Sequence, residues 1–351
     1  MAQQAYVTDT DNGGSGPEHR GNRFRRLAAG AVSGWWREPR IWRRGRVVAV
    51  LAVLVALVML LHAQIPNTVG NLGSLIETFL PWLGLAVPAL LLLALIRKSA
   101  TALIAVVLPA AVWLNLFGGL LFDKTTGTGG DDLTVATHNV NADNPDPSGT
   151  ARDVAGSGAD VVALEELASP AVPVYESVLA STYPYHSVQG TVGLWSKYPL
   201  TGVKSVNIKL GWTRAMRATV ATPEGAVAVY VAHLPSVRVK LAAGFTARQR
   251  DTSADALGEA IAHEKLPRKI LLGDLNGTMN DRSLKGVTSQ LRSTQGAAGN
   301  GFGFSWPASF PMARIDQIMV QGVTPVTSWT LPRTGSDHLP VAARVKLDTG
   351  S

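Results

Sequence analysis

Residues 269–276 read KILLGDLN, and this stretch carries the clearest local indication of the fold. The Ile–Leu–Leu run before Gly273 is typical of a buried strand that ends in a turn. Asp274 and Asn276 follow it, so a carboxylate and an amide stand at a strand end, where rigid scaffolds place functional side chains. An ordinary turn after a strand fits GDLN equally well.

Similar patterns recur on both sides of this stretch. Strands are predicted at 133–140, 161–165, 192–196, 203–209, 226–232, 269–273, 317–320 and 341–345, and helices at 152–158, 172–181, 245–263 and 281–290. Many short strands with fewer helices favour a mixed, layered α/β domain. Polar side chains lie at the strand ends, and they are Asn139, Asn141, Glu165, Glu166, His233, Asp316, Asp337 and His338.

The chemistry of these side chains indicates the kind of metal site to expect. Oxygen atoms of Asn, Asp and Glu suit Mg²⁺ or Mn²⁺. The chain has no cysteine, which excludes disulfides and thiolate metal sites, and it has no His pair at metal-binding spacing. We therefore expect Mg²⁺, or Mn²⁺ in its place, rather than zinc.

The N-terminal third has a different composition. The mean hydropathy of the chain is +0.15, and most of the apolar excess lies in three segments, 47–63, 79–96 and 100–122. At about 1.5 Å per residue such helices reach roughly 25–35 Å, enough to cross a bilayer. They predict three transmembrane helices within residues 47–122. A cleaved signal peptide explains the first segment less well, because 46 residues precede it and two apolar segments follow.

Charge predicts the orientation of these helices. Residues 1–46 hold nine Arg and four acidic residues and are predicted to be a disordered cytoplasmic tail. The connection 64–78 has no Lys or Arg, whereas the turn between the second and third segments has Arg97 and Lys98. Basic connections stay in the cytoplasm. A linker at 123–132 would then lead to an extracytoplasmic domain at 133–348. The protein would be a multi-pass protein of the cell membrane.

The net charge of +7 does not indicate nucleic-acid binding. Residues 131–351 contain 20 basic and 19 acidic residues, so the C-terminal domain is almost neutral. Nonspecific DNA binding depends on concentrated positive charge. Nucleic acid is therefore a less favoured partner than a membrane-bound substrate, and the oligomeric state stays open.

Seven phrases in one order carry a family resemblance. They are THNVN (137–141), ADVVALEEL (159–167), GLWSKYPL (193–200), YVAHLP (230–235), ILLGDLN (270–276), RIDQIMV (314–320) and SDHLPV (336–341). Residues 131–346 thereby resemble the endonuclease/exonuclease/phosphatase superfamily. The resemblance implies an α+β fold, a four-layer α/β/β/α sandwich like that of deoxyribonuclease, here preceded by three transmembrane helices. It also implies a metal-dependent phosphoester hydrolase.

The resemblance further implies a role for each residue. Glu166, Asn139 and Asp337 would bind the metal, and Asn139 would also contact substrate. Asp274 would orient or deprotonate the attacking water, Asn276 and His233 would contact phosphoryl oxygens, and Asp316 would orient His338. Whether Asp274 or His338 takes the proton stays open.

Four positions add to or depart from this pattern. Asn141 stands where some family nucleases have Asp, which leaves one or two metals possible. Glu165 takes the place of the usual Gln and would add a carboxylate beside the metal. Arg238 and Lys240 follow His233 and are candidates for substrate phosphate, against the alternative of a solvated helix face.

The expected substrate follows from the membrane anchor. A domain held a few residues from a bilayer meets lipid head groups at high effective concentration. The Arg-rich tail, the three apolar segments and IPNTVGNLGSLIETFLPWLGL (65–85) resemble actinobacterial membrane proteins of this superfamily linked to teicoplanin resistance. That resemblance implies a lipid phosphate such as undecaprenyl pyrophosphate and a role in glycopeptide resistance. The alternatives are an extracytoplasmic nuclease that scavenges phosphate and, less favoured, a non-catalytic binding protein.

Overall fold

The computed structural model of the chain describes residues 42–68, 70–127, 132–236 and 244–347. Two compact units can be distinguished. One contains residues up to Leu54 together with Leu85–Pro109, and the other contains Val55–Gly84 and the chain from Ala110 onward. The second unit therefore joins the connection between the first two apolar segments to the predicted catalytic domain.

The N-terminal helices are shorter and more broken than the sequence predicts. They are α3 (Arg46–Leu60), η1 (His62–Gln64), α4 (Leu72–Thr78), η2 (Leu80–Leu85), α5 (Ala86–Ile96), α6 (Ala100–Phe117) and η3 (Gly118–Leu120). Among the described residues, one helix, Ala100–Leu120, is long and apolar enough to cross a membrane. A second qualifies only if the pair Leu72–Thr78 and Leu80–Ile96, bent by 71°, counts as one span.

The described residues therefore do not include three straight helices of membrane-spanning length. The helix in the first apolar segment is Arg46–Leu60, which has 15 residues and falls short of the usual length for a span. The second segment is the helical stretch Leu80–Ile96, which begins as the 3-10 helix η2, and the 71° bend separates it from α4 at Phe79. Pro81 follows this bend, and its missing N–H prevents continuous α-helical hydrogen bonding from α4. Three transmembrane helices remain a prediction.

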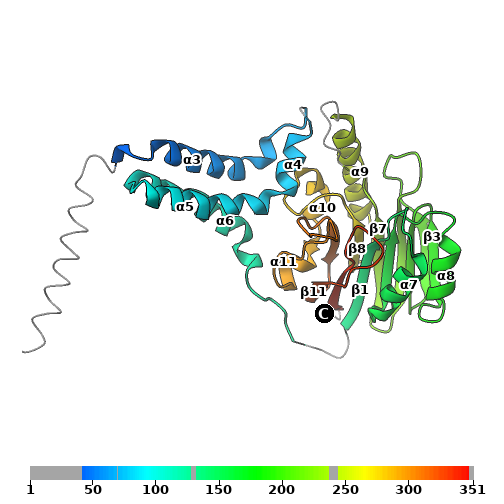
Figure 1. The fold of residues 1–351 in the computed structure, drawn as a ribbon. Helices are drawn as coiled ribbons and strands as arrows, with labels where there is room; N and C mark the ends of the chain where they lie inside the picture. The colour runs from blue at the N-terminus through cyan, green and yellow to red at the C-terminus, as the bar shows by residue number, and fades with distance from the viewer. Residues whose placement is uncertain (1–41, 69, 128–131, 237–243, 348–351) are drawn as a thin grey trace, which may run out of the picture. The chain divides into compact units, whose positions relative to one another are not determined.

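The described residues of the C-terminal domain form two six-stranded sheets (Figure 1). The first sheet has the order β11 (Thr324–Thr330), β12 (Val341–Lys346), β1 (Asp132–Asn139), β2 (Val161–Glu165), β4 (Val192–Ser196), β3 (Tyr185–Gln189). The second has the order β5 (Leu200–Ser205), β6 (Ala215–Thr222), β7 (Gly225–Ala232), β8 (Lys269–Asp274), β10 (Asp316–Gln321), β9 (Arg292–Ser293). The helices are α7 (Pro147–Gly156), α8 (Val172–Leu179), α9 (Gly244–Ala262), η4 (Arg282–Leu284), α10 (Lys285–Thr288) and α11 (Thr294–Ala298).

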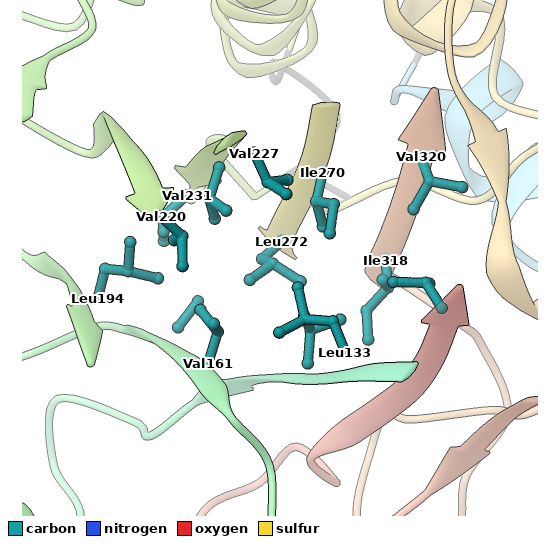
Figure 2. Close-up of a cluster of buried hydrophobic side chains, with 14 of the residues drawn as sticks. Leu133, Val161, Leu194, Val220, Val227, Val231, Ile270, Leu272, Ile318 and Val320 are labelled. Atoms are coloured by element: carbon teal, nitrogen blue, oxygen red, sulfur yellow. The ribbon is translucent and has the colours of Figure 1, made fainter. Parts of the chain in front are cut away.

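Side-chain alternation along the strands explains the layers. In β7, Val227, Val229 and Val231 point into a core shared by both sheets, and Tyr230 points to the opposite face. Figure 2 shows this shared core, to which Leu133 of the first sheet also belongs. The outer face of the second sheet packs with α9 and α10, and that of the first packs with α7 and α8. The described domain is thus an α+β sandwich with the predicted layer order α/β/β/α.

Some element boundaries differ from the predictions. The predicted helix 152–158 is Pro147–Gly156, because Asp146 caps its first turn by accepting a hydrogen bond from the Gly149 N–H, with Pro147 at the first helical position. The predicted helix 281–290 is divided into η4 and α10. Strands β3, β6, β9 and β11 were not predicted; β3 alternates weakly and is largely exposed.

Candidate active site

Strand ends from both sheets meet at one edge of the sandwich. β1 and β2 run parallel and place Asn139 opposite Glu165. In the other sheet β8 runs antiparallel to β10 and places Asp274 opposite Asp316. Because β1 and β8 also contact each other across the core, side chains from both sheets converge at this edge.

Asp316 and His338 form a buried ion pair. The His338 Nδ1 atom lies 2.9 Å and 3.1 Å from the two carboxylate oxygens of Asp316. Burial alone would lower the pKa of His338, but the negative charges of Asp316 and Asp274 outweigh it and raise that pKa to about 10. Burial raises the pKa of Asp316, but the positive charge of His338 outweighs burial, so the net effect is a lowered pKa. His338 is therefore a cation whose ring is oriented by Asp316.

The loop that carries His338 is attached to the first strand. The Ser336 hydroxyl donates to the Asn139 carbonyl at 2.7 Å and accepts from the His338 N–H at 3.1 Å. One serine thus joins the SDH turn to the end of β1. The predicted site residues at these two strand ends are brought together.

Asp274 lies at the centre of the site. One of its oxygens accepts from the Asn276 N–H at 2.8 Å, and the other accepts from the amides of Asn139 at 3.0 Å and Asn276 at 3.2 Å. The Nε2 atom of His338 lies 3.9 Å from the second oxygen. Burial, with the negative charge of Asp316, raises the pKa of Asp274 to about 7, against the opposing effect of the His338 cation. A carboxylate with such a pKa can accept a proton near neutral pH.

His233 is buried beside Asp274 as a neutral ring. Its Nε2 atom lies 3.6 Å from Asp274 and 3.4 Å from Glu166, and its ring contacts the Arg214 guanidinium. Burial, followed by the positive charges of Arg214 and His338, lowers its pKa well below the usual value. His233 is in place for a phosphate contact, as a neutral group.

Glu166 and Asp337 bring carboxylates to the mouth of the site. Glu166 follows β2 with φ of 60°, its side chain is one-third exposed, and one oxygen accepts from the Ala142 N–H at 3.2 Å. Asp337 is exposed. Both line one pocket of 390 Å³ together with Asp274.

The pocket also has walls that were not predicted as part of the site. Beyond the predicted site residues, it is lined by Ser74, Leu75, Thr78, Phe79, Ser236, Trp306 and Ile315. The first four belong to α4 and the residue that follows it, which lie in the same compact unit as the domain. The sequence did not predict any part of residues 64–78 near the site.

A family model described as Endonuclease/Exonuclease/phosphatase family matches residues 136–338, more than half of the chain. The chain belongs to the endonuclease/exonuclease/phosphatase family. The match contains every predicted site residue, from Asn139 to His338. Enzymes of this family break phosphoester bonds, and the domain has their fold.

Solved structures agree with the family's fold. One is humanized D. rerio TDP2, with a TM-score of 0.52 and 19% identity over 61% of this chain and 99% of that chain. Another is the endonuclease/exonuclease/phosphatase from Bacteroides vulgatus, with a TM-score of 0.51 and 15% identity over 62% and 99%. Staphylococcus aureus beta toxin has a TM-score of 0.50 and 15% identity over 60% and 99%. These likenesses concern the fold. A comparison with curated proteins finds no match.

The donor set in this family member fits a divalent cation. Glu166, Asp274 and Asp337 line one pocket, and carboxylate oxygens are the ligands that Mg²⁺ and Mn²⁺ prefer. Ligand atoms of Asp274, Asp316 and His338 also lie within 4.8 Å of one another. Both oxygens of Asp316 already face His338, so Glu166 and Asp337 are the carboxylates of this pocket that could hold a cation.

Two structural details bear on the predicted metal site. The Asn139 amide nitrogen faces Asp274 and its oxygen accepts from the Asn141 N–H at 3.0 Å, and its contact with the metal stays a prediction. Glu165 is fully buried and accepts from the Thr137 hydroxyl at 2.7 Å. Burial raises the pKa of Glu165 well above its usual range, which disfavours the negative charge that the sequence predicted beside the metal.

The structure gives different outcomes for other basic residues near the motifs. Arg238 and Lys240 lie outside the described residues, so their predicted contact with substrate stays a prediction. Arg214 precedes β6 and touches His233; sequence reasoning missed it because no motif surrounds it. His138, adjacent to Asn139, is buried and bonds to Thr334 at 2.8 Å, and burial lowers its pKa to about 3.

Proposed function

We propose that the chain is a metal-dependent hydrolase that acts on a phosphoester or pyrophosphate bond of a membrane lipid, such as undecaprenyl pyrophosphate. The observation that carries the reaction class is the arrangement of Asp274 between the His338 cation, bound to Asp316, and the amides of Asn139 and Asn276. A general base beside a cationic group and neutral donors is what attack by water on an anionic phosphorus centre requires.

Each residue of the site has its own proposed role in the reaction. Asp274 holds the attacking water and accepts its proton, since its pKa lies near 7. His338 stays protonated through Asp316 and stabilises negative charge that develops on the phosphoryl group. Asn276 and neutral His233 supply contacts to phosphoryl oxygens without adding negative charge. Mg²⁺ or Mn²⁺, held by Glu166 and Asp337, would neutralise phosphate oxygens and polarise phosphorus.

Two observations support a lipid substrate. Large apolar side chains are exposed on the N-terminal helices, among them Leu60 at 59%, Leu92 at 59% and Ile96 at 66%. Such surfaces suit a lipid environment. The catalytic domain is nearly neutral, which disfavours long nucleic acids. We propose that the chain is a multi-pass protein of the cell membrane whose catalytic domain lies on the extracytoplasmic side. We also propose that it contributes to glycopeptide resistance through turnover of lipid pyrophosphate.

The second candidate function is an extracytoplasmic nuclease. A structure of D. rerio TDP2 complexed with single strand DNA product resembles this chain with a TM-score of 0.52 and 18% identity. One catalytic arrangement can serve enzymes with different substrates, because the surface around the catalytic residues selects the substrate. This alternative requires a route for a polynucleotide on both sides of the reacting phosphate.

One experiment separates the two. Full-length protein in detergent, with Mg²⁺, is given a polyprenyl pyrophosphate, a phospholipid and single-stranded DNA, and released phosphate or cleaved DNA is measured. We expect the highest kcat/KM for the polyprenyl pyrophosphate. A kcat/KM that is highest for DNA would overturn the lipid proposal in favour of the nuclease.

A further inference from the structure

The connection between the first two apolar helices is attached to the catalytic domain. Thr278 lies two residues after Asn276, and its hydroxyl donates a hydrogen bond to the Glu77 carbonyl at 3.1 Å. The indole N–H of Trp82 donates to the Met312 carbonyl at 2.8 Å. These contacts fasten α4 and the residues after it beside the strand ends that carry the site.

The start of the same connection is held separately. The Arg282 guanidinium donates to the Ala63 carbonyl at 2.9 Å and also to the Ile65 carbonyl. The Trp82 ring stacks on Phe304 at 5.8 Å between ring centroids. Contacts at both ends make the connection a fixed part of the domain surface rather than a free loop.

Arg250 forms the buried centre of this attachment. Its side chain is 1% exposed, and its guanidinium lies 2.7 Å from Asp281. It donates to the Ser74 hydroxyl at 3.1 Å and to the Asn276 carbonyl at 2.8 Å. One cation thus links α4 to the loop that carries Asn276. Its burial and these partners show that Arg250 is not a substrate contact.

The attached connection supplies one wall of the catalytic pocket. Ser74, Leu75, Thr78 and Phe79 line the pocket and are here called the α4 wall. Leu75 and Phe79 are four residues apart, a spacing that brings side chains to one side of a helix, and both are half-buried. Trp306 and Ile315 line the same pocket from the domain. All four members of the wall are uncharged.

The wall restricts which phosphates fit. A phosphodiester within a polynucleotide continues on both sides of the phosphate, and its neighbours need further cationic contacts. The α4 wall offers none of these contacts, and it helps confine the pocket to 390 Å³. A terminal phosphate on an apolar chain leaves one side free and can place the chain against Leu75 and Phe79.

We propose that the α4 wall determines substrate specificity: it selects a phosphate at the end of an apolar chain and excludes a polynucleotide. The proposal rests on the proposed lipid-phosphate function and names the residues that recognise the apolar chain. The wall comes from the connection between the apolar helices, so specificity and anchoring reside in the same segment of the chain.

The test opens the wall in the full-length protein in detergent. The double variant Leu75→Ala/Phe79→Ala removes apolar contacts, and Leu72→Ala on the same helix is the matched control, because Leu72 is 45% exposed and does not line the pocket. The probes are farnesyl pyrophosphate, p-nitrophenyl phosphate and a single-stranded 12-mer of DNA. Thermal unfolding confirms that each variant is folded.

We expect the kcat/KM ratio of farnesyl pyrophosphate to the 12-mer to fall by about 10-fold or more in the double variant, and to stay within about twofold in the control. A narrowing variant, Leu75→Trp, should move the ratio of p-nitrophenyl phosphate to farnesyl pyrophosphate upward. Unchanged ratios in folded variants would overturn the role of the wall.

Failure of the lipid function would look different. The wild-type protein would then leave farnesyl pyrophosphate intact while hydrolysing p-nitrophenyl phosphate, whereas efficient cleavage of the 12-mer by the wild-type protein would contradict the wall itself. In that case the wall is tested by the ratio of the 12-mer to p-nitrophenyl phosphate, which opening must raise. A wild-type protein inactive on all three probes with Mg²⁺ would contradict both proposals.

Discussion

The Nδ1 atom of His338 lies 2.9 Å from a carboxylate oxygen of Asp316, and the Nε2 atom of the same ring lies 3.9 Å from Asp274. The ring therefore stands between a carboxylate that orients it and a carboxylate that can act as a base. Asp316 and Asp274 face each other in register on neighbouring strands, which fixes this arrangement through the backbone.

The first prediction concerns this pair. Asp316→Asn should lower kcat by about 100-fold or more, His338→Ala should cost at least as much, and the double variant should be little worse than His338→Ala, because residues that act as a unit are not additive. Steady-state kinetics of the three variants measure this. Fully additive losses would show that the two residues act independently.

The same pair predicts a pH effect. His338 must be protonated, so activity falls as pH rises through its pKa, which the charge of Asp316 raises to about 10. In Asp316→Asn that charge is gone, and the alkaline limb of the pH–rate profile should move to lower pH. An alkaline limb that stays in place would contradict the assignment of His338 as the cation.

Metal dependence is predicted to pass through Glu166. Glu166→Ala, or EDTA with the wild-type protein, should lower activity by about 1,000-fold while the thermal unfolding curve keeps its cooperative shape. Glu165→Gln is the matched control; Glu165 is buried and its pKa is raised well above the usual range, so this change should keep activity within about threefold. Near-normal activity of Glu166→Ala at low Mg²⁺ would mean that another carboxylate binds the ion.

Arg250 is predicted to stabilise the attachment of α4. Arg250→Met leaves Asp281 buried without its partner and should lower the free energy of unfolding by about 3–5 kcal/mol. The pair Arg250→Met/Asp281→Asn should recover part of that loss, because the unpaired buried charge is removed. Denaturant unfolding of the two variants checks this. Equal losses in both would assign the effect to packing rather than to charge.

Acid stability should depend on Glu264. Its carboxylate lies 2.8 Å from the Arg217 Nε atom and accepts from Tyr230 at 3.0 Å. Burial would raise its pKa, but these hydrogen bonds outweigh burial and lower it to about 2. A depressed pKa stabilises the fold above the ordinary value near 4.5, and this contribution is lost as pH falls toward 2.

The comparison of wild type with Glu264→Gln isolates this effect. We expect a difference of roughly 2–3 kcal/mol in the free energy of unfolding at neutral pH, shrinking toward zero near pH 2. Urea unfolding at several pH values measures it. A difference independent of pH would assign the effect of the variant to shape rather than to charge.

Topology is the last prediction. Alkaline phosphatase fused after Ser351 should be active, and a fluorescent reporter that folds only in the cytoplasm should be dark at the same position. Fluorescence without phosphatase activity would place the domain in the cytoplasm.

Much of the site could be read from the sequence because its residues stand at strand ends in short, ordered motifs. Asp274 and Asn276 follow an apolar run that is visible over a few residues, and Asp337 and His338 precede another. Strand alternation likewise indicates which side chains enter a core. Family, layered fold and principal site residues follow from such local patterns together with their order along the chain.

Other features arise only from tertiary structure. Ser74 meets Arg250 across 176 residues, and Trp82 meets Met312 across 230 residues; neither pair has a local signature. The raised pKa of Glu165 depends on complete burial, which its position at the end of a hydrophobic strand does not reveal. The sequence by itself determined the family and the layered fold, because both are set by short motifs and their order along the chain. The wall of the pocket and the protonation of its buried acids were decided by packing, because contact and dielectric environment depend on which distant segments meet.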